Sequence, residues 1–230
     1  MNKYKVLLID LDDTILSFSK AEAYAIKKVC EHYHIEVNDD IIKLYKDINL
    51  KYWHMLERKE ITREKLLEER FKEFFNTINC KAENTDKAND IYFSYLTSVV
   101  FYIDGSVAAL KKLKERYKIY LITNGVKMVQ EKRLSIASDV ACLLDGKYVS
   151  ESIGFPKPTK EYMDYVLDDL KIDKKEILII GDSVTSDMML GINNGIDTCW
   201  FNEENKKTDA NITYEVHNYD DILRLLMGES

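Results

Sequence analysis

Proline and glycine are scarce in this chain, with 2 and 8 of them among 230 residues. Flexible linkers and low-complexity tracts are normally rich in these residues, so we predict neither. No apolar run approaches the roughly 20 residues that a membrane-spanning helix needs. The N-terminal residues also lack the charged-then-apolar pattern of a signal peptide. We therefore expect a cytoplasmic protein without a membrane partner.

Cysteine and histidine are also few, and neither forms a metal-binding pattern. The 4 cysteines are widely scattered, which favours buried, reduced thiols over disulfides. Of the 4 histidines, His32 and His34 lie two residues apart on a predicted helix and so point to different faces. A net charge of −7 and a pI near 5.3 argue against nucleic acid polymers and anionic membranes as partners.

Strand-like apolar runs alternate with helical patterns from Asp104 onward. One predicted strand lies near the N-terminus, at residues 4–9. The others lie at 119–122, just before 150, at 177–180, at 198–201 and just after 213. Strands that alternate with helices are typical of a parallel α/β sheet with helices on both faces. We therefore predict a Rossmann-like parallel core that includes the first strand.

Residues 17–96 instead carry four amphipathic helical patterns and no strand pattern. The predicted helices begin near Ser19, after the N-cap Asn38, after the N-cap Thr62 and near Asp86. Helices joined by short loops are typical of a small bundle. We predict two domains, which are an α/β core of residues 1–16 and 97–230 and an inserted helical-bundle cap of residues 17–96.

Polar residues gather where the predicted core strands end, which is where parallel sheets bind their ligands. They form four segments: Asp10-Leu11-Asp12-Asp13-Thr14, Thr123-Asn124-Gly125, Lys157-Pro158, and Gly181-Asp182-Ser183-Val184-Thr185-Ser186-Asp187. If the strands are neighbours, the four carboxylates of Asp10, Asp12, Asp182 and Asp187 meet in one crevice, where their charges repel. A hard divalent cation with oxygen ligands would relieve that repulsion, and Mg²⁺ fits best. Mg²⁺, a lysine and amide donors are also what a phosphate group needs.

Each segment also has an ordinary structural explanation when taken alone. Two acids in a turn are common, and Thr-Asn-Gly after a strand is a frequent turn. A single lysine is usually just solvated, while Asp182 and Asp187 could simply cap a helix. All four segments in this order, each at a strand end, favour phosphoryl-transfer chemistry over coincidence.

The chemistry of the residues themselves gives each a candidate role. Asp10 is the candidate nucleophile that forms an aspartyl-phosphate, and Asp12 is the candidate acid and base. Thr123 offers a hydroxyl, and the Asn124-Gly125 backbone offers amides, to a phosphate group. Lys157 would bring an ammonium to the same phosphate.

These segments closely resemble the motifs of the haloacid dehalogenase superfamily, in its phosphatase branch with an inserted helical cap. The resemblance extends along essentially the whole chain. The details are most similar to the pyrimidine nucleoside monophosphatase subgroup. They are Asp12-Asp13-Thr14, Thr123-Asn124-Gly125, Ser150-Glu151 ahead of Gly154-Phe155-Pro156-Lys157-Pro158, and Gly181-Asp182-Ser183 with Ser186-Asp187. The resemblance implies that Mg²⁺ is held by the carboxylates of Asp10 and Asp182 and by the main-chain carbonyl of Asp12. It places Ser183 and Asp187 behind these ligands, where Asp187 would orient a metal-bound water or hold Lys157.

The expected substrates are small phosphorylated metabolites, with nucleoside 5′-monophosphates first. Phosphoglycolate and sugar phosphates are alternative substrates, and a phosphomutase or a catalytically silent phosphate-ligand binding protein are alternative functions. Two aromatic residues in the cap region, Phe18 and Trp53, are candidates for stacking on a nucleobase, although ordinary packing also explains them. The sequence leaves open whether the protein is a monomer or a homodimer.

Overall fold

The computed structural model describes residues 3–80 and 85–228. The chain divides into two compact units, one of Met1–Ser17 with Phe101–Ser230 and the other of Phe18–Val100. Residues 1–2, 81–84 and 229–230, which the predicted domain ranges include, lie outside the described residues. No helix of the described residues is long and apolar enough to span a membrane.

The first unit is built on a six-stranded sheet with the strand order β3-β2-β1-β4-β5-β6. The strands are β1 (Val6–Asp10), β2 (Lys118–Thr123), β3 (Gly146–Val149), β4 (Ile177–Gly181), β5 (Asp197–Phe201) and β6 (Tyr214–Val216). Each neighbouring pair is parallel, so the predicted fold class is confirmed. Because β1 lies between β2 and β4, the ends of these three strands meet in the middle of the sheet.

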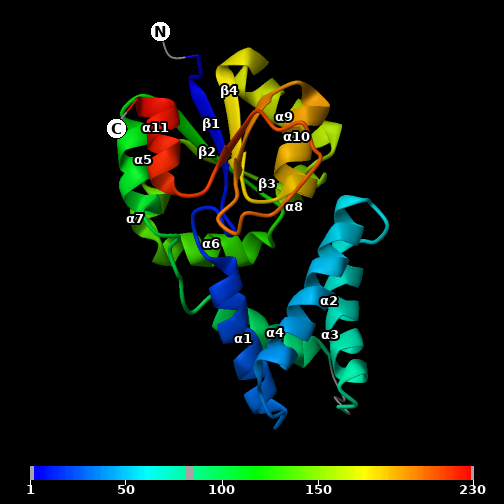
Figure 1. The fold of residues 1–230 in the computed structure, drawn as a ribbon. Helices are drawn as coiled ribbons and strands as arrows, with labels where there is room; N and C mark the ends of the chain where they lie inside the picture. The colour runs from blue at the N-terminus through cyan, green and yellow to red at the C-terminus, as the bar shows by residue number, and fades with distance from the viewer. Residues whose placement is uncertain (1–2, 81–84, 229–230) are drawn as a thin grey trace. The chain divides into compact units, whose positions relative to one another are not determined.

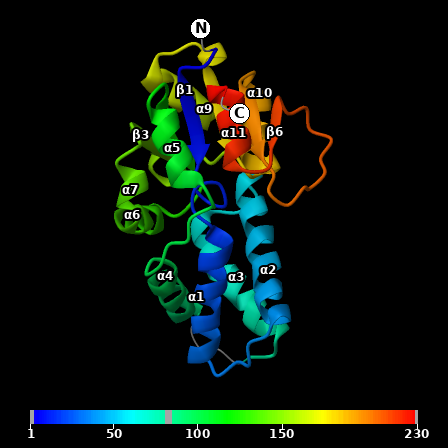
Figure 2. The same ribbon diagram turned by 60° about the vertical axis from the view of Figure 1, so that its left-hand side comes forward.

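Helices cover both faces of this sheet. The helices of this unit are α5 (Ser106–Lys114), α6 (Lys127–Ile136), α7 (Ser138–Ala141), α8 (Ser150–Ile153), α9 (Lys160–Leu170), α10 (Met189–Asn194) and α11 (Tyr219–Met227), with short helical turns η1 (Lys174–Glu176) and η2 (Val184–Met188). Figures 1 and 2 show α5 and α11 on one face and α9 and α10 on the other. The helix expected from about Ser186 is in fact a π-helical turn, η2, that runs directly into α10.

The central strands are buried throughout, which explains their continuous apolar runs. On one face, Val6 and Leu8 pack with Ile177 and Ile179 in a core that includes Tyr162 of α9. This packing fixes β1 against β4, so Asp10 and the residues after Gly181 are held at the same edge of the sheet. The core therefore determines where the polar segments meet.

The second unit is a bundle of α1 (Phe18–His32), α2 (Asp39–Glu57), α3 (Arg63–Thr77) and α4 (Thr85–Leu96). Its two predicted N-caps are confirmed, because Asn38 Oδ1 accepts from Ile41 N at 2.9 Å and Thr62 Oγ1 accepts from Lys65 N at 3.3 Å. Buried aromatic rings fill its centre. The ring centroid of Tyr45 lies 5.1 Å from that of Phe71 and 5.5 Å from that of Tyr92.

A buried polar network joins the helices of the bundle across this aromatic core. Asn49 Nδ2 donates to Glu22 Oε1 at 2.7 Å, and Arg70 donates to Asn49 Oδ1 at 3.1 Å and to Asn89 Oδ1 at 2.8 Å. The Arg70 guanidinium also lies 4.7 Å from the centre of the Tyr92 ring. Because buried polar groups must find partners, this network favours one register of the four helices.

Candidate active site

The side chain of Lys157 joins two buried carboxylates at the carboxyl edge of the sheet. Its Nζ donates to Asp10 Oδ1 at 2.6 Å and to Asp187 Oδ1 at 2.6 Å. A third bond, at 3.2 Å, goes to the main-chain oxygen of Ile122, the residue of β2 that is paired with Asp10. Lys157 is only 1% exposed, so it is not the solvated surface lysine that its sequence context alone would suggest.

The side chain of Asn124 fixes the main chain of Lys157 through two hydrogen bonds. Asn124 Nδ2 donates to Lys157 O at 2.9 Å, and Lys157 N donates to Asn124 Oδ1 at 2.8 Å. This pair of bonds places the lysine segment against the end of β2, although the two residues are far apart in sequence. The Asn124 side chain is therefore used to position Lys157, while the phosphate-binding role predicted for this residue stays a prediction.

Asp187 is completely buried and is held at both of its carboxylate oxygens. Oδ1 accepts from Lys157, and Oδ2 accepts from Ser183 N at 3.2 Å. The π-helical turn η2 carries Asp187 back over the end of β4, and Ser183 caps this turn by accepting from Ser186 N. Ser183 and Asp187 therefore both belong to the turn after β4, and the roles behind the metal ligands that the resemblance implies for them stay predictions.

Gly181 is the last residue of β4, and the Asp187 side chain packs directly against it. A Cβ atom at this position would overlap the Asp187 carboxylate, with the Asp187 Cβ only 2.7 Å away. The chain therefore needs glycine here, because any side chain would push Asp187 off Lys157.

We expect Gly181→Ala to lower both stability and activity. Overpacking of this kind costs about 1–3 kcal/mol, and displacement of Asp187 would leave Lys157 with one carboxylate fewer. Thermal melts and turnover of a phosphate ester measure the two effects. A variant that melts and turns over like the parent would contradict this packing.

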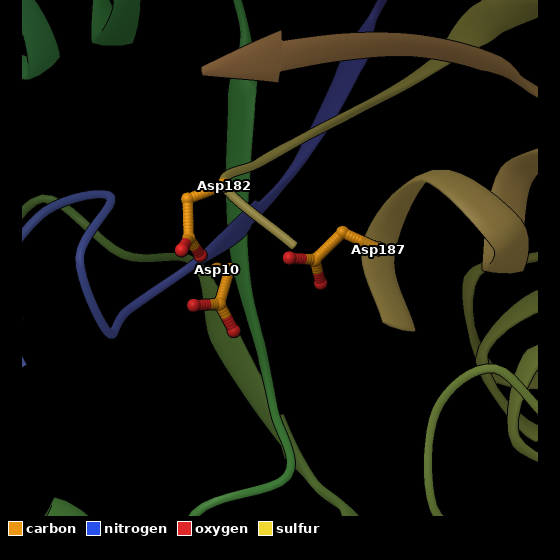
Figure 3. Close-up of side chains that lie close together, drawn as sticks. All are labelled: Asp10, Asp182 and Asp187. Carbon is orange, nitrogen blue, oxygen red and sulfur yellow. The ribbon is translucent and has the colours of Figure 1, made fainter. Parts of the chain in front are cut away.

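Asp182 completes a group of three carboxylates. Ligand atoms of Asp10, Asp182 and Asp187 all lie within 4.8 Å of one another. Figure 3 shows the Asp182 and Asp10 carboxylates side by side, with Asp187 pointing toward them from the helix that follows β4. The indole of Trp200 donates to the main-chain oxygen of Asp182 at 2.8 Å, which fixes this residue from β5.

Burial and mutual repulsion shape the ionisation of this cluster. Burial raises the pKa of Asp10, and although the Lys157 ammonium lowers it, the charges of Asp187 and Asp12 raise it further. Burial raises the pKa of Asp182 well above its usual range, and the Asp10 and Asp187 charges add to this. Burial lowers the pKa of Lys157, but its two carboxylate partners raise it by more. Lys157 is therefore cationic, but its single positive charge does not offset the repulsion among the carboxylates of Asp10, Asp182 and Asp187.

The residues of this cluster fit a divalent metal ion. Three carboxylates (−3) and one ammonium (+1) leave a formal charge of −2, which one divalent cation would balance. Lys157 and Ser183 occupy both oxygens of Asp187, whereas Lys157 bonds to only Oδ1 of Asp10. Asp10 and Asp182 are therefore the better placed carboxylate ligands, and oxygen ligands suit Mg²⁺.

Thr123 ends β2 beside this cluster, and its hydroxyl oxygen is already used as an acceptor. Gly125 N donates to Thr123 Oγ1 at 3.0 Å, and Gln130 Nε2 donates to it at 2.9 Å. Two donors occupy the two lone pairs of a hydroxyl. The Thr123 proton is thus the group that remains to be offered to a ligand oxygen.

Two residues of α6, Gln130 and Arg133, contact the candidate acid and base, and sequence reasoning missed both. Gln130 Nε2 donates to Asp12 Oδ2 at 2.6 Å, and Arg133 Nη1 forms an ion pair with Asp12 Oδ1. Both side chains are buried. The available signal was a polar residue and an arginine at i and i+3 on a short helix directly after the Thr-Asn-Gly turn.

The structure thus brings together most of the predicted site residues in the first unit. These residues are Asp10, Asp12, Thr123, Asn124, Lys157, Asp182, Ser183 and Asp187. The two aromatic candidates lie in the helical unit. Phe18 begins α1 and Trp53 lies on α2, where the Arg63 guanidinium is 5.7 Å from the Trp53 ring centre. Their role in binding a base stays a prediction.

Comparison with known proteins agrees with this geometry. The profile of the haloacid dehalogenase-like hydrolase family matches residues 4–195. YfnB of Bacillus subtilis, which is named a HAD-hydrolase, is 34% identical over 100% of this chain and 98% of its own length. Its crystal structure with bound magnesium superposes with a TM-score of 0.92 at 33% identity, and the match covers 98% of this chain and 99% of that one.

Two further relatives carry a more specific name. The pyrimidine 5′-nucleotidase PynA of Streptococcus pneumoniae is 32% identical over 97% of this chain and 95% of its own length. The pyrimidine 5′-nucleotidase YjjG of Escherichia coli is 26% identical over 97% of this chain and 98% of its own length. With the family match and the site geometry together, the chain belongs to the haloacid dehalogenase-like hydrolases.

Proposed function

We propose that this hydrolase is a Mg²⁺-dependent phosphomonoesterase that acts on nucleoside 5′-monophosphates through an aspartyl-phosphate on Asp10. The observation that carries the proposal is the position of Lys157 Nζ, 2.6 Å from both Asp10 and Asp187, beside the Asp182 carboxylate at the end of the sheet. The Lys157 ammonium fixes the candidate nucleophile Asp10. The negative charge that remains on the three carboxylates favours a divalent cation as the second positive charge of the site.

In the first half-reaction, a carboxylate oxygen of Asp10 attacks phosphorus in line, and the bond to the leaving alkoxide breaks. Lys157 stays bonded to the Asp10 carboxylate and offsets the charge that the incoming phosphate brings. The Thr123 hydroxyl donates to a phosphoryl oxygen. Asp12 gives its proton to the leaving oxygen.

In the second half-reaction, water attacks the phosphorus of the aspartyl-phosphate and Asp10 is released. Asp12, now ionised, takes a proton from that water. Asp187 does not react in this scheme but keeps Lys157 in place. A bound Mg²⁺ would be held by Asp10, Asp182 and the Asp12 carbonyl, and would supply a positive charge that screens the phosphate from these acids.

The names of PynA and YjjG support pyrimidine 5′-monophosphates as the substrates, because the similarity to both relatives covers nearly the whole chain. We propose that the helical unit selects among esters, with Phe18 and Trp53 as candidate base-stacking residues. Phosphoglycolate and sugar phosphates are the competing substrate classes. A binding protein without turnover is the competing function, but each residue that the scheme requires is present.

Phosphate release from a panel of esters, with Mg²⁺ and with EDTA, tests the proposal. The panel should pair UMP, dTMP and CMP with AMP and GMP, and should include nucleoside 3′-monophosphates, phosphoglycolate and sugar phosphates. We expect release only with Mg²⁺ and fastest from pyrimidine 5′-monophosphates. Preference for phosphoglycolate or a sugar phosphate would contradict the substrate assignment, and the absence of any turnover would contradict the phosphatase assignment.

A further inference from the structure

The Asp12 carboxylate is held at both oxygens by the same helix. Arg133 Nη1 bonds to Oδ1, and Gln130 Nε2 donates to Oδ2 at 2.6 Å. The two α6 residues also bond to each other, because Arg133 Nη1 donates to Gln130 Oε1 at 3.1 Å. Three side chains thus form a closed ring of bonds.

Burial makes this arrangement costly, which argues against an accidental contact. Arg133 is 0% exposed and Gln130 is 1% exposed, whereas 26% of the Asp12 side chain remains open to solvent. Burying a guanidinium carries a desolvation penalty of several kcal/mol, which is recovered only through good pairing. An apolar side chain at either position would avoid this penalty.

Gln130 also ties the carboxylate to the phosphate-binding hydroxyl. Its Nε2 lies 2.6 Å from Asp12 Oδ2 and 2.9 Å from Thr123 Oγ1, so one amide group sets the spacing between them. Gly125 makes room for this amide, because a Cβ atom there would overlap the Gln130 side chain. The glycine of the Thr-Asn-Gly segment is therefore explained by Gln130 rather than by the turn alone.

We propose that Gln130 and Arg133 are positioning residues that hold the Asp12 carboxylate in the orientation from which it exchanges protons. The proposal rests on the proposed phosphatase function. An aspartate on a loop rotates about two side-chain bonds, and two fixed donors remove that freedom before substrate arrives. Positioning of this kind is a large part of what an active site contributes.

Replacing Gln130 or Arg133 should therefore have the same kinetic effect as replacing Asp12, but a smaller one. p-Nitrophenolate leaves without needing a proton, so phosphorylation of Asp10 by p-nitrophenyl phosphate depends little on Asp12. Hydrolysis of the aspartyl-phosphate needs a base to activate water. A badly held Asp12 should slow the second step more than the first.

The experiment compares the variants Arg133→Met and Gln130→Met with the parent and with Lys132→Met. Lys132 is an exposed residue next to Arg133 on the same helix, so its substitution removes a like charge without touching Asp12. Stopped-flow release of p-nitrophenolate reports the first step. Acid-quench mass spectrometry reports the phosphoryl adduct on Asp10, and thermal melts report folding.

We expect both α6 variants to show a burst and to accumulate the Asp10 adduct, with the first step slowed less than about tenfold and the second by about a hundredfold. Lys132→Met should behave as the parent does. In an Asp12→Asn background, Arg133→Met should add no further loss, because residues that act through one group are not additive.

Equal slowing of both steps, or losses that add in the double variant, would overturn the positioning role and leave a structural one. If Arg133→Met does not fold, Gln130→Met decides the matter alone, because it exchanges a neutral side chain for one of similar size. A parent that turns over no ester overturns the proposed function, and the positioning role with it. A parent that works beside variants without adduct overturns only the positioning role.

Discussion

Replacing Asp10 by asparagine will abolish turnover of every phosphate ester, and no phosphoryl adduct will form on the protein. The amide cannot attack phosphorus, so the loss should be of the order of 10⁴-fold or more, as for other residues that act as the nucleophile. Burial already raises the pKa of Asp10, so a neutral side chain of the same shape should be tolerated by the fold. Mass spectrometry after a rapid acid quench checks the adduct, and thermal melts check the folding.

Replacing Asp12 by asparagine should give a different result at the same site. With p-nitrophenyl phosphate, the nucleophile still attacks and the leaving group needs no proton, so a burst of p-nitrophenolate should precede slow turnover. The aspartyl-phosphate should then accumulate on Asp10, because the base that activates water is missing. The pair of variants thus separates the two roles, which loss of activity alone would not do.

The controls for this pair lie in the same experiment. The parent should show the adduct only briefly, and Asp10→Asn should show none. An adduct on another residue, or equal adduct in Asp10→Asn, would contradict the assignment of Asp10. Complete loss of the burst in Asp12→Asn would instead mean that Asp12 is needed for attack itself.

The strand ends could be predicted from the sequence because burial on both faces of a parallel sheet produces continuous apolar runs. Val6–Asp10 and Ile177–Gly181 are buried at every position. Because such strands run parallel, the residues that follow them lie at the same edge of the sheet. That reasoning located Asp10, Asp182 and Thr123 without any knowledge of contacts. Asn38 and Thr62 were predictable for a similar reason, since capping is a local interaction.

The contacts within the site could not be predicted, because they join residues distant in sequence. Gln130 and Arg133 lie 118 and 121 residues from Asp12, and their i and i+3 spacing on α6 is equally typical of an ordinary polar helix face. The bond of the Asn124 side chain to the Lys157 main chain spans 33 residues. The π-helical turn η2 was missed because its Ser- and Thr-rich sequence is also typical of a normal helix start.

Lys157→Met and Asp182→Asn should change the stability of the metal-free protein in opposite directions, although both remove activity. Lys157 is buried between Asp10 and Asp187, so its loss leaves two buried carboxylates without their partner. Breaking such a pairing costs about 3–5 kcal/mol, which lowers the melting temperature by on the order of 10 °C for a protein of this size.

Asp182→Asn removes a negative charge from the cluster, whereas Lys157→Met removes a positive one. Burial and the charges of Asp10 and Asp187 raise the pKa of Asp182 well above its usual range, so without metal this carboxylate is repelled by its neighbours. Removing one negative charge relieves the repulsion, and the variant should melt at the parent's temperature or above it in EDTA. The parent should gain stability from Mg²⁺ by mass action, whereas Asp182→Asn should gain little.

Melting curves in EDTA and in Mg²⁺ test both variants, with Asp164→Asn as the matched control. Asp164 is exposed on α9, where it forms an ion pair with Lys160, so its substitution should leave the response to Mg²⁺ intact. Marked destabilisation of Asp182→Asn in EDTA would show that Asp182 serves as a structural cap for the turn after β4. A Lys157→Met protein that melts like the parent would show that the buried carboxylates do not depend on the lysine, and the charge balance argued for the site would be wrong.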